Sequence, residues 1–190
     1  MKERILVTGG TGYIGSHTVV ELQNSGYDVV IVDNLSNSSA DVVDNIEKVS
    51  GIRPAFEKLD CLDFEGMDKL FTKYPGIKGI IHFAASKAVG ESVQKPLLYY
   101  RNNLVSLINL LELMPKHGVE GIIFSSSCTV YGQPDVLPVT EEAPIKKLSL
   151  RTVIQNRSMK KLFVIQLLRD RLSMLLCCVT LILLAHIPLH

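Results

Sequence analysis

Three glycines, Gly9, Gly12 and Gly15, follow a short apolar run and precede a stretch with helical periodicity. A turn of this kind between a strand and a helix binds nucleotide phosphates, because main-chain N–H groups and the positive end of the helix dipole point at them. A side chain at Gly9 would block the tight turn, and one at Gly12 would hold the backbone away from a pyrophosphate. Gly15 lets the helix and the strand pack closely.

An acidic residue lies at the expected distance from these glycines. Asp33 ends the second apolar run, 18 residues after Gly15. A carboxylate there accepts hydrogen bonds from the adenosine ribose hydroxyls and repels a 2′-phosphate, so the pattern favours NAD over NADP. The alternative interpretation is an ordinary glycine turn followed by an aspartate that caps the next loop. The joint occurrence of the glycine spacing and the carboxylate favours the nucleotide site.

Strand and helix patterns alternate along the chain. Apolar runs predict buried strands at 5–8, 28–33, 54–59, 79–84 and 120–125. Helical periodicity and capping residues predict helices at 13–25, 39–50, 63–73 and 96–117. This alternation predicts right-handed crossovers and an α/β fold, a doubly wound, Rossmann-like parallel sheet covered on both faces.

Composition excludes several classes of protein. A chain of 190 residues that is 47% hydrophobic and 21% charged suits one domain with a buried core. The net charge of +1 excludes a chain-wide basic surface for nucleic acid. The four cysteines form no C-x-x-C pair and the five histidines are scattered, so we expect neither a metal site nor a disulfide framework. The first residues lack the features of a signal peptide, which predicts a cytoplasmic protein.

Three stretches of the chain have a distinctive sequence. They are residues 7–18 with the Gly-x-x-Gly-x-x-Gly spacing, residues 82–97 beginning His-Phe-Ala-Ala-Ser-Lys-Ala-Val-Gly-Glu-Ser, and residues 124–132 reading Phe-Ser-Ser-Ser-Cys-Thr-Val-Tyr-Gly. These stretches resemble the UDP-glucose 4-epimerases of the extended short-chain dehydrogenase/reductase family. The middle stretch is specific to the epimerases and disfavours related enzymes such as dehydratases. The resemblance covers residues 1–149, which we interpret as an NAD-binding domain.

The resemblance also implies a role for individual side chains. Taken one at a time, Lys87, Asn102 and Ser127 could equally well be solvated residues without a function. Their joint occurrence at the spacing of the family pattern favours a functional role. Ser127 would be catalytic and bond the sugar 4-hydroxyl, and Lys87 would lie on the substrate side as well as against the cofactor. The implied cofactor contacts are Gly9, Gly12, Tyr13, Ile14 and Gly15 at the pyrophosphate, Asp33, Asn34, Asn37 and Ser38 at the adenosine ribose, Asp60 and Cys61 at the adenine, and Phe83, Ala84, Ala85, Lys87 and Asn102 at the nicotinamide side.

The reaction that the resemblance implies belongs to galactose metabolism. Tightly held NAD oxidises a UDP-sugar at C4, the 4-keto intermediate rotates, and the hydride returns to its other face. The implied partners are the UDP-sugar and a second subunit, with no nucleic acid and no membrane. Family members pair through two long helices, and the second would follow position 150, where this chain departs from the family pattern. The sequence therefore does not support a family-type dimer.

The general base of the family is missing from the expected place. The family uses a Tyr with a Lys four residues later, because the nearby cation favours the phenolate. About 25 residues after Ser127 the chain reads Arg-Thr-Val-Ile-Gln-Asn, and no Tyr follows Tyr131. We therefore expect a truncated, inactive epimerase relative whose sheet is incomplete relative to the family. The alternatives are an NAD-binding module without turnover and a membrane-associated protein that uses its tail.

The last 41 residues, 150–190, form an aberrant basic and apolar tail. Residues 146–190 hold 8 Lys and Arg against 1 Asp, whereas residues 1–145 hold 12 against 18 Asp and Glu. The apolar run 172–185 has 14 residues, whereas a spanning helix needs about 20. Synonymous codons can be chosen for residues 149–156 so that the reading frame two bases later encodes Ser-Pro-Tyr-Gly-His-Thr-Lys. In the same offset frame, codons for residues 178–188 can encode a second stretch that resembles the epimerases. We interpret the tail as the product of a frameshift near Leu148.

The nucleotide sequence tests this interpretation. Sequencing codons 145–192 should show Tyr-Gly-His-Thr-Lys in the offset frame, because a single frameshift preserves the bases that encoded the original residues. An offset frame without this pattern would refute the frameshift.

Overall fold

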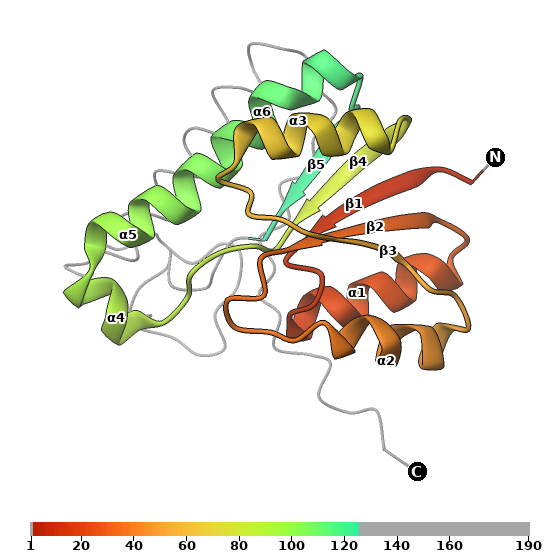
Figure 1. Ribbon diagram of the computed structural model, residues 1–190, viewed down its shortest axis with the longest axis horizontal. Helices are drawn as coiled ribbons and strands as arrows, with labels where there is room; N and C mark the ends of the chain where they lie inside the picture. Colours follow the sequence, from red (N-terminus) through yellow and green to blue (C-terminus); the bar gives the residue numbers. More distant parts are fainter. Residues whose placement is uncertain (1, 126–190) are drawn as a thin grey trace, which may run out of the picture.

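The computed structural model describes residues 2–125, and these form a parallel sheet with helices on both faces (Figure 1). The strand order is β3-β2-β1-β4-β5, and every neighbouring pair is parallel. The strands are β1 (Arg4–Thr8), β2 (Asp28–Asp33), β3 (Ala55–Lys58), β4 (Ile77–His82) and β5 (Gly121–Phe124). This architecture confirms the predicted doubly wound α/β fold.

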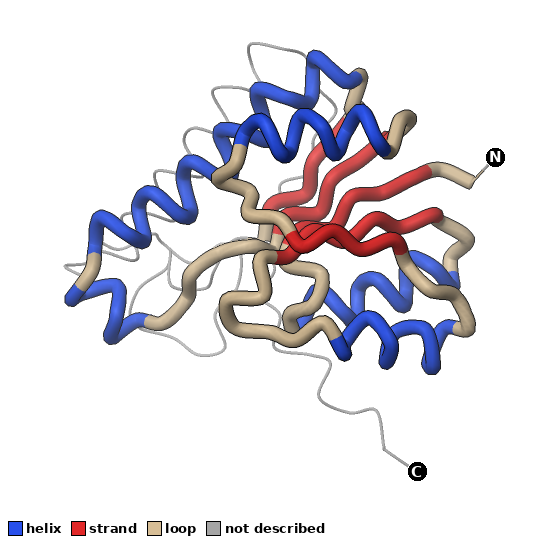
Figure 2. Tube along the Cα trace, in the orientation of Figure 1, coloured by secondary structure: helices blue, strands red, loops and turns tan. Residues whose placement is uncertain are grey.

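The helices divide between the two faces of the sheet. The pair α1 (Tyr13–Asn24) and α2 (Asp41–Ser50) covers one face, and the pair α3 (Phe64–Lys73) and α6 (Ser106–His117) covers the other (Figures 1 and 2). The chain reaches α6 through α4 (Val89–Gln94), α5 (Pro96–Tyr100) and a π-helical turn η1 (Arg101–Val105). Elements α5, η1 and α6 follow one another without a break, and β5 comes after them.

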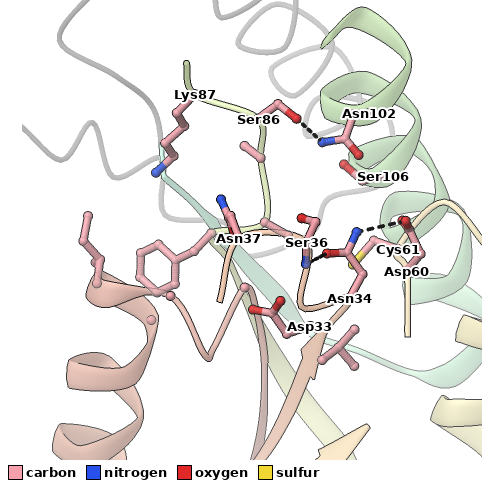
Figure 3. Close-up of a pocket in the computed structure, with 18 of the residues that line it drawn as sticks. Asp33, Asn34, Ser36, Asn37, Asp60, Cys61, Ser86, Lys87, Asn102 and Ser106 are labelled. Atoms are coloured by element: carbon pink, nitrogen blue, oxygen red, sulfur yellow. Dashed lines mark hydrogen bonds between the residues drawn. The ribbon is translucent and has the colours of Figure 1, made fainter. Parts of the chain in front are cut away.

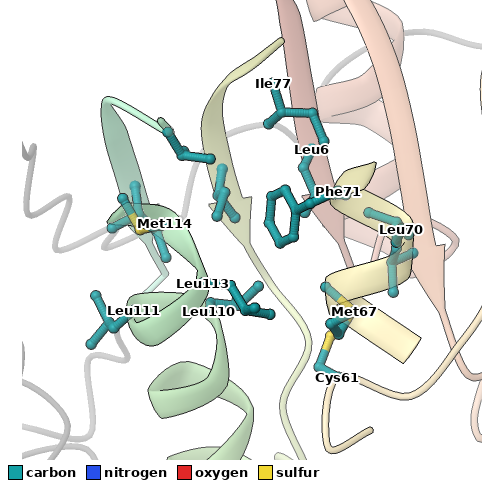
Figure 4. Packing of buried hydrophobic residues seen from close by; sticks show 14 of the residues in the cluster. Leu6, Cys61, Met67, Leu70, Phe71, Ile77, Leu110, Leu111, Leu113 and Met114 are labelled. Atoms are coloured by element: carbon teal, nitrogen blue, oxygen red, sulfur yellow. The ribbon is translucent and has the colours of Figure 1, made fainter. Parts of the chain in front are cut away.

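Alternating strand residues fill two separate cores. In β1, Leu6 packs with the α3 and α6 side chains, whereas Val7 packs with those of α1 and α2. The same alternation places Val30 of β2 in the first core and Ile31 in the second. Because side chains of a strand point alternately to opposite faces, a strand buried on both sides reads as a continuous apolar run. Figure 4 shows the larger core, with Leu110 and Met67 among its labelled residues.

Helix ends follow the capping residues of the sequence. Asp63 precedes α3, and its Oδ1 accepts a hydrogen bond from the Gly66 main-chain N–H at 3.0 Å. Helix α6 ends at Gly118, whose φ of 67° lies in the left-handed region that favours glycine. Both boundaries agree with the predicted helices 63–73 and 96–117.

The clearest differences from the sequence-based expectation lie in β4 and in the stretch that leads to α6. Strand β4 is displaced by two residues from the predicted 79–84, since the exposed Lys78 interrupts the apolar run at its start. The predicted helix 96–117 is continuous but contains the π turn η1, and the short helix α4 precedes it. The predicted domain boundary at 149 and the tail 150–190 lie outside the described residues. Among the helices of residues 2–125, none combines the length and the apolar composition that a membrane span requires.

Candidate nucleotide-binding site

A candidate site lies where the strand order reverses. Strands β1 and β4 are neighbours, but the crossover that follows β1 runs over one face of the sheet and the one that precedes β4 runs over the other. Loops on either side of such a point separate and leave a crevice at the carboxyl ends of the strands. A cavity of about 340 Å³ occupies this position (Figure 3). Its walls come from the segments that follow β1, β2, β3 and β4 and from the helix that contains Asn102.

The glycine turn forms the floor of this cavity. Gly9 has a φ of 70°, and a Cβ there would lie 2.7 Å from the Ala84 main-chain nitrogen. A Cβ on Gly15 would lie 2.2 Å from the Gly9 carbonyl oxygen. Residues with side chains are excluded at both positions, as the sequence predicted for a tight turn and close helix packing. No side chain caps α1, and its first turn lines the cavity, which is the arrangement that binds phosphate.

The Asp33 carboxylate is held in place at the end of β2. Its Oδ1 accepts hydrogen bonds from the Leu35 main-chain N–H at 2.9 Å and from the Ser38 hydroxyl at 3.2 Å. Its Oδ2 accepts a bond from the Thr11 main-chain N–H at 3.3 Å. These bonds orient the carboxylate beside the glycine turn.

A neutral thiol and an amide–carboxylate pair border the same end of the cavity. The Asn34 amide donates to the Asp60 carboxylate at 3.0 Å (Figure 3). Cys61 is buried, and burial together with the charges of Asp60 and Asp33 raises the pKa of its thiol to about 12. Cys61 is therefore an uncharged wall residue, which suits contact with a base ring better than nucleophilic chemistry.

The opposite wall is the segment that follows β4. Figure 3 shows Lys87 extending from this segment toward the cavity, and Asn102 approaching from the helix with its amide donating to the Ser86 hydroxyl at 2.8 Å. Although Lys87 as a whole residue is exposed, neighbouring atoms withdraw its ammonium from water and lower its pKa. Lys87 is the one cation among the described residues that line the cavity.

The buried His82 side chain connects β4 to β1 and to α6 through hydrogen bonds beside the cavity. His82 Nδ1 lies 2.6 Å from the Thr8 hydroxyl, and Nε2 lies 3.5 Å from the Ser106 hydroxyl. Burial, followed by the charge of Lys87, lowers the pKa of His82 to about 4. The imidazole is thus neutral at physiological pH and has hydrogen-bond partners on both nitrogens. His82 is therefore a hydrogen-bonded core residue.

The fold gathers most of the predicted site residues around one cavity. Fifteen of the sixteen predicted cofactor residues line it, and the sixteenth, Ser38, bonds to Asp33 behind it. Ser127 lies outside the described residues. Sequence reasoning missed Ser106 although it lies four residues after Asn102, the spacing of neighbours on one helix face. The lining residues not predicted are Val32, Ser36, Leu59, Ser86 and Ser106. Within 2–125, no three His, Cys, Asp or Glu side chains cluster as a metal site would require.

Comparison with known proteins identifies the class of this fold and site. The profile of the NAD dependent epimerase/dehydratase family matches residues 5–168, so the chain belongs to that family.

Within that family the chain is similar to UDP-glucose 4-epimerases. It is 54% identical over 141 residues to that of Bacillus subtilis, covering 74% of this chain and 41% of the relative. It is 50% identical over 150 residues to that of Homo sapiens, covering 76% and 43%. The structure of the Bifidobacterium longum UDP-glucose 4-epimerase in complex with NAD⁺ and UDP superimposes with a TM-score of 0.86 at 42% identity, covering 91% of this chain and 52% of that one. The chain thus spans about half the length, or less, of these relatives, and the resemblance stated from the sequence is confirmed.

We predict that Gly15→Ala destabilises the fold by about 1–3 kcal/mol, because the added methyl group overlaps the Gly9 carbonyl and forces the turn to move. Urea unfolding measures the change. Gly90→Ala is the matched control, since a Cβ at this helical position meets no atom within 4 Å and alanine favours helix. Equal stability of the two variants would contradict the close contact.

We predict that His82 makes the protein acid-sensitive. Between its ordinary pKa of 6.5 and its folded value of about 4, the unfolded chain binds more protons than the folded chain, so stability falls as the pH falls through this window. The pKa difference corresponds to about 3 kcal/mol.

Urea unfolding at pH 6.5 and pH 4 checks this prediction. His82→Gln should lose less stability between the two values than the unmodified chain does. His17→Gln, on the exposed side of α1, is the control and should behave as the unmodified chain. The same loss in both variants would show that His82 does not contribute.

Proposed function

We propose that this chain binds NAD in the crevice at the carboxyl ends of β1, β2 and β4, and that it is a UDP-glucose 4-epimerase relative without turnover of its own. The observation that supports this proposal best is the position of the Asp33 carboxylate beside the glycine turn. The same cavity is bordered by Lys87 and Asn102 on its opposite wall. A bound dinucleotide would place its adenosine ribose at Asp33 and its nicotinamide side at Lys87 and Asn102.

The residues present fit this cofactor. The pyrophosphate would lie over the glycine turn at the start of α1, where Tyr13 and Ile14 line the cavity. The oriented Asp33 oxygens would accept bonds from the adenosine ribose. The residues that follow Asp33, from Asn34 to Ser38, include no cation that would neutralise a 2′-phosphate. NAD is therefore favoured over NADP.

Bound NAD would supply a reversible hydride acceptor for a carbon of the sugar, and the chain's own residues would bind and orient the two reactants. Lys87 would lie between the cofactor and the UDP-sugar, and Ser127 would bond the sugar hydroxyl. The proton of that hydroxyl needs a base, and no Tyr-x-x-x-Lys pair follows Ser127, where the family has its own. Binding without turnover follows. The similarity to UDP-glucose 4-epimerases over this half supports the cofactor assignment.

Calorimetric titration of the purified chain tests the cofactor assignment. We expect NAD to bind and NADP to bind at least about tenfold more weakly. Asp33→Asn should weaken NAD binding by about ten- to a hundredfold, because a hydrogen bond to a charged group is lost. Asp44→Asn, on the exposed side of α2, is the control and should bind NAD as the unmodified chain does. Absence of NAD binding to the unmodified chain would overturn the proposal.

The same preparation tests the lack of turnover. With UDP-galactose and NAD, the chain should give no UDP-glucose above the blank, whereas the B. subtilis relative assayed in parallel provides the positive signal. Turnover by this chain would show that another group replaces the missing base.

A further inference from the structure

Two buried asparagines on the α5–η1–α6 stretch each hold a loop of the crevice. Asn103, in the π turn, accepts a hydrogen bond from the Ser86 main-chain N–H at 2.8 Å through its Oδ1 and donates to the Ser86 carbonyl at 3.0 Å through its Nδ2. Its Oδ1 also accepts from the Asn102 amide at 3.3 Å. Both polar groups of the Ser86 main chain are thus satisfied by one side chain.

The second asparagine holds the opposite loop. The Asn109 amide donates to the Cys61 carbonyl at 2.9 Å and to the Leu62 carbonyl at 3.1 Å. Both residues follow β3, and Cys61 lines the end of the cavity where Asp60 also lies. One helical stretch therefore fixes the two walls that face each other across the crevice.

Neither asparagine lines the cavity, so neither would touch a bound nucleotide. Asn103 is 3% exposed and Asn109 is 6% exposed, and amides this buried are costly unless they are hydrogen-bonded. Their position behind the walls indicates that they act through the loops that they hold.

Helix α6 is anchored in the larger core and to α3, so it can hold both loops in fixed positions. Leu110, Leu113 and Met114 of α6 are fully buried in the larger core (Figure 4). At its far end, Lys116 and His117 bond to the two oxygens of Asp68 in α3 at 2.7 and 2.6 Å. Loops attached to such an element share its position.

The π turn brings two adjacent side chains to the same loop. Asn102 and Asn103 both bond to Ser86, the first to its hydroxyl and the second to its main chain. Single π turns within helices are often found at functional sites. Here the π turn directs Asn102 into the cavity wall while Asn103 holds the backbone behind it.

We propose that Asn103 and Asn109 are positioning residues that divide the crevice between them, Asn103 fixing the wall at the nicotinamide end and Asn109 fixing the wall at the adenine end. This inference rests on the proposed NAD site for its ligand. The two contacts themselves are independent of the ligand. Loss of either side chain should therefore affect one end of the crevice and not the other.

Hydrogen exchange of the full chain without nucleotide tests the contacts. In Asn103→Leu the Ser86 amide loses its acceptor and should exchange about tenfold faster, with the Leu62 amide unchanged. In Asn109→Leu the turn 60–63 loses its support, and the Leu62 amide should exchange faster with Ser86 unchanged. Leu113→Ala, which weakens the same helix without touching either loop, is the control and should leave the ratio of the two rates as it is.

Titration with NAD and with ADP-ribose, which lacks the nicotinamide, tests the division of the crevice. The unmodified chain should bind NAD more tightly than ADP-ribose. Asn103→Leu should weaken NAD binding by about tenfold and leave ADP-ribose binding unchanged, whereas Asn109→Leu should weaken both by the same factor. Leu113→Ala should keep the ratio of the two affinities.

The outcomes separate this inference from the proposed function. If the unmodified chain binds neither nucleotide, the proposed function fails, while the exchange rates still decide whether the asparagines hold the loops. If NAD binds but the two leucine variants behave alike, or both behave as Leu113→Ala, the inference is overturned and the proposed function stands. Equal affinity of the unmodified chain for NAD and ADP-ribose overturns the role of Asn103. The variants Asn103→Ser and Asn109→Ser repeat the comparison, so that poor folding of one pair does not decide it.

Discussion

At the carboxyl ends of β1 and β4, main-chain atoms of three segments lie so close together that no side chain would fit between them. The turn after β1 passes under the end of β4, and α1 begins against that same turn, so that Gly9 lies against Ala84 and Gly15 against Gly9. The crevice exists because these three segments meet without side chains between them. Every other wall of the cavity is positioned relative to this contact, since β1 and β4 carry the loops on either side of the reversal in strand order.

Buried polar groups keep the crevice in shape without placing net charge beneath it. Thr8, His82 and Ser106 form a chain of hydrogen bonds between β1, β4 and α6, and all three are at most 3% exposed. The low pKa of His82 means that these three hydrogen-bonded side chains carry no charge at physiological pH. An uncharged support is what a low-dielectric interior tolerates, provided that each polar atom has a partner. The asparagines of the adjoining helix extend the same arrangement to the walls.

The two ends of the cavity differ in charge. Asp33 and Asp60 lie at one end, and Lys87 lies at the other. The uncapped first turn of α1 also lines the cavity, which gives it the character of an anion-binding site. The family relationship is established over residues 5–168.

Several features of this protein follow from local sequence alone. The apolar runs and caps predicted the strands and the helix ends at Asp63 and Gly118, because burial on both faces and capping are local properties. The glycine spacing and Asp33 predicted where the cavity would lie. The absence of a Tyr-x-x-x-Lys pair after Ser127 is likewise a property of the sequence.

Only the tertiary structure decided how the walls are held. The bonds of Asn103 to Ser86 and of Asn109 to Cys61 join residues 17 and 48 positions apart. The displacement of β4 and the π turn at Arg101–Val105 likewise reflect pairing with β1 and contacts to the Ser86 loop. Periodicity reports which face of an element is buried, but a hydrogen bond between distant segments depends on how the sheet brings them together. That information is absent from any short stretch of the chain.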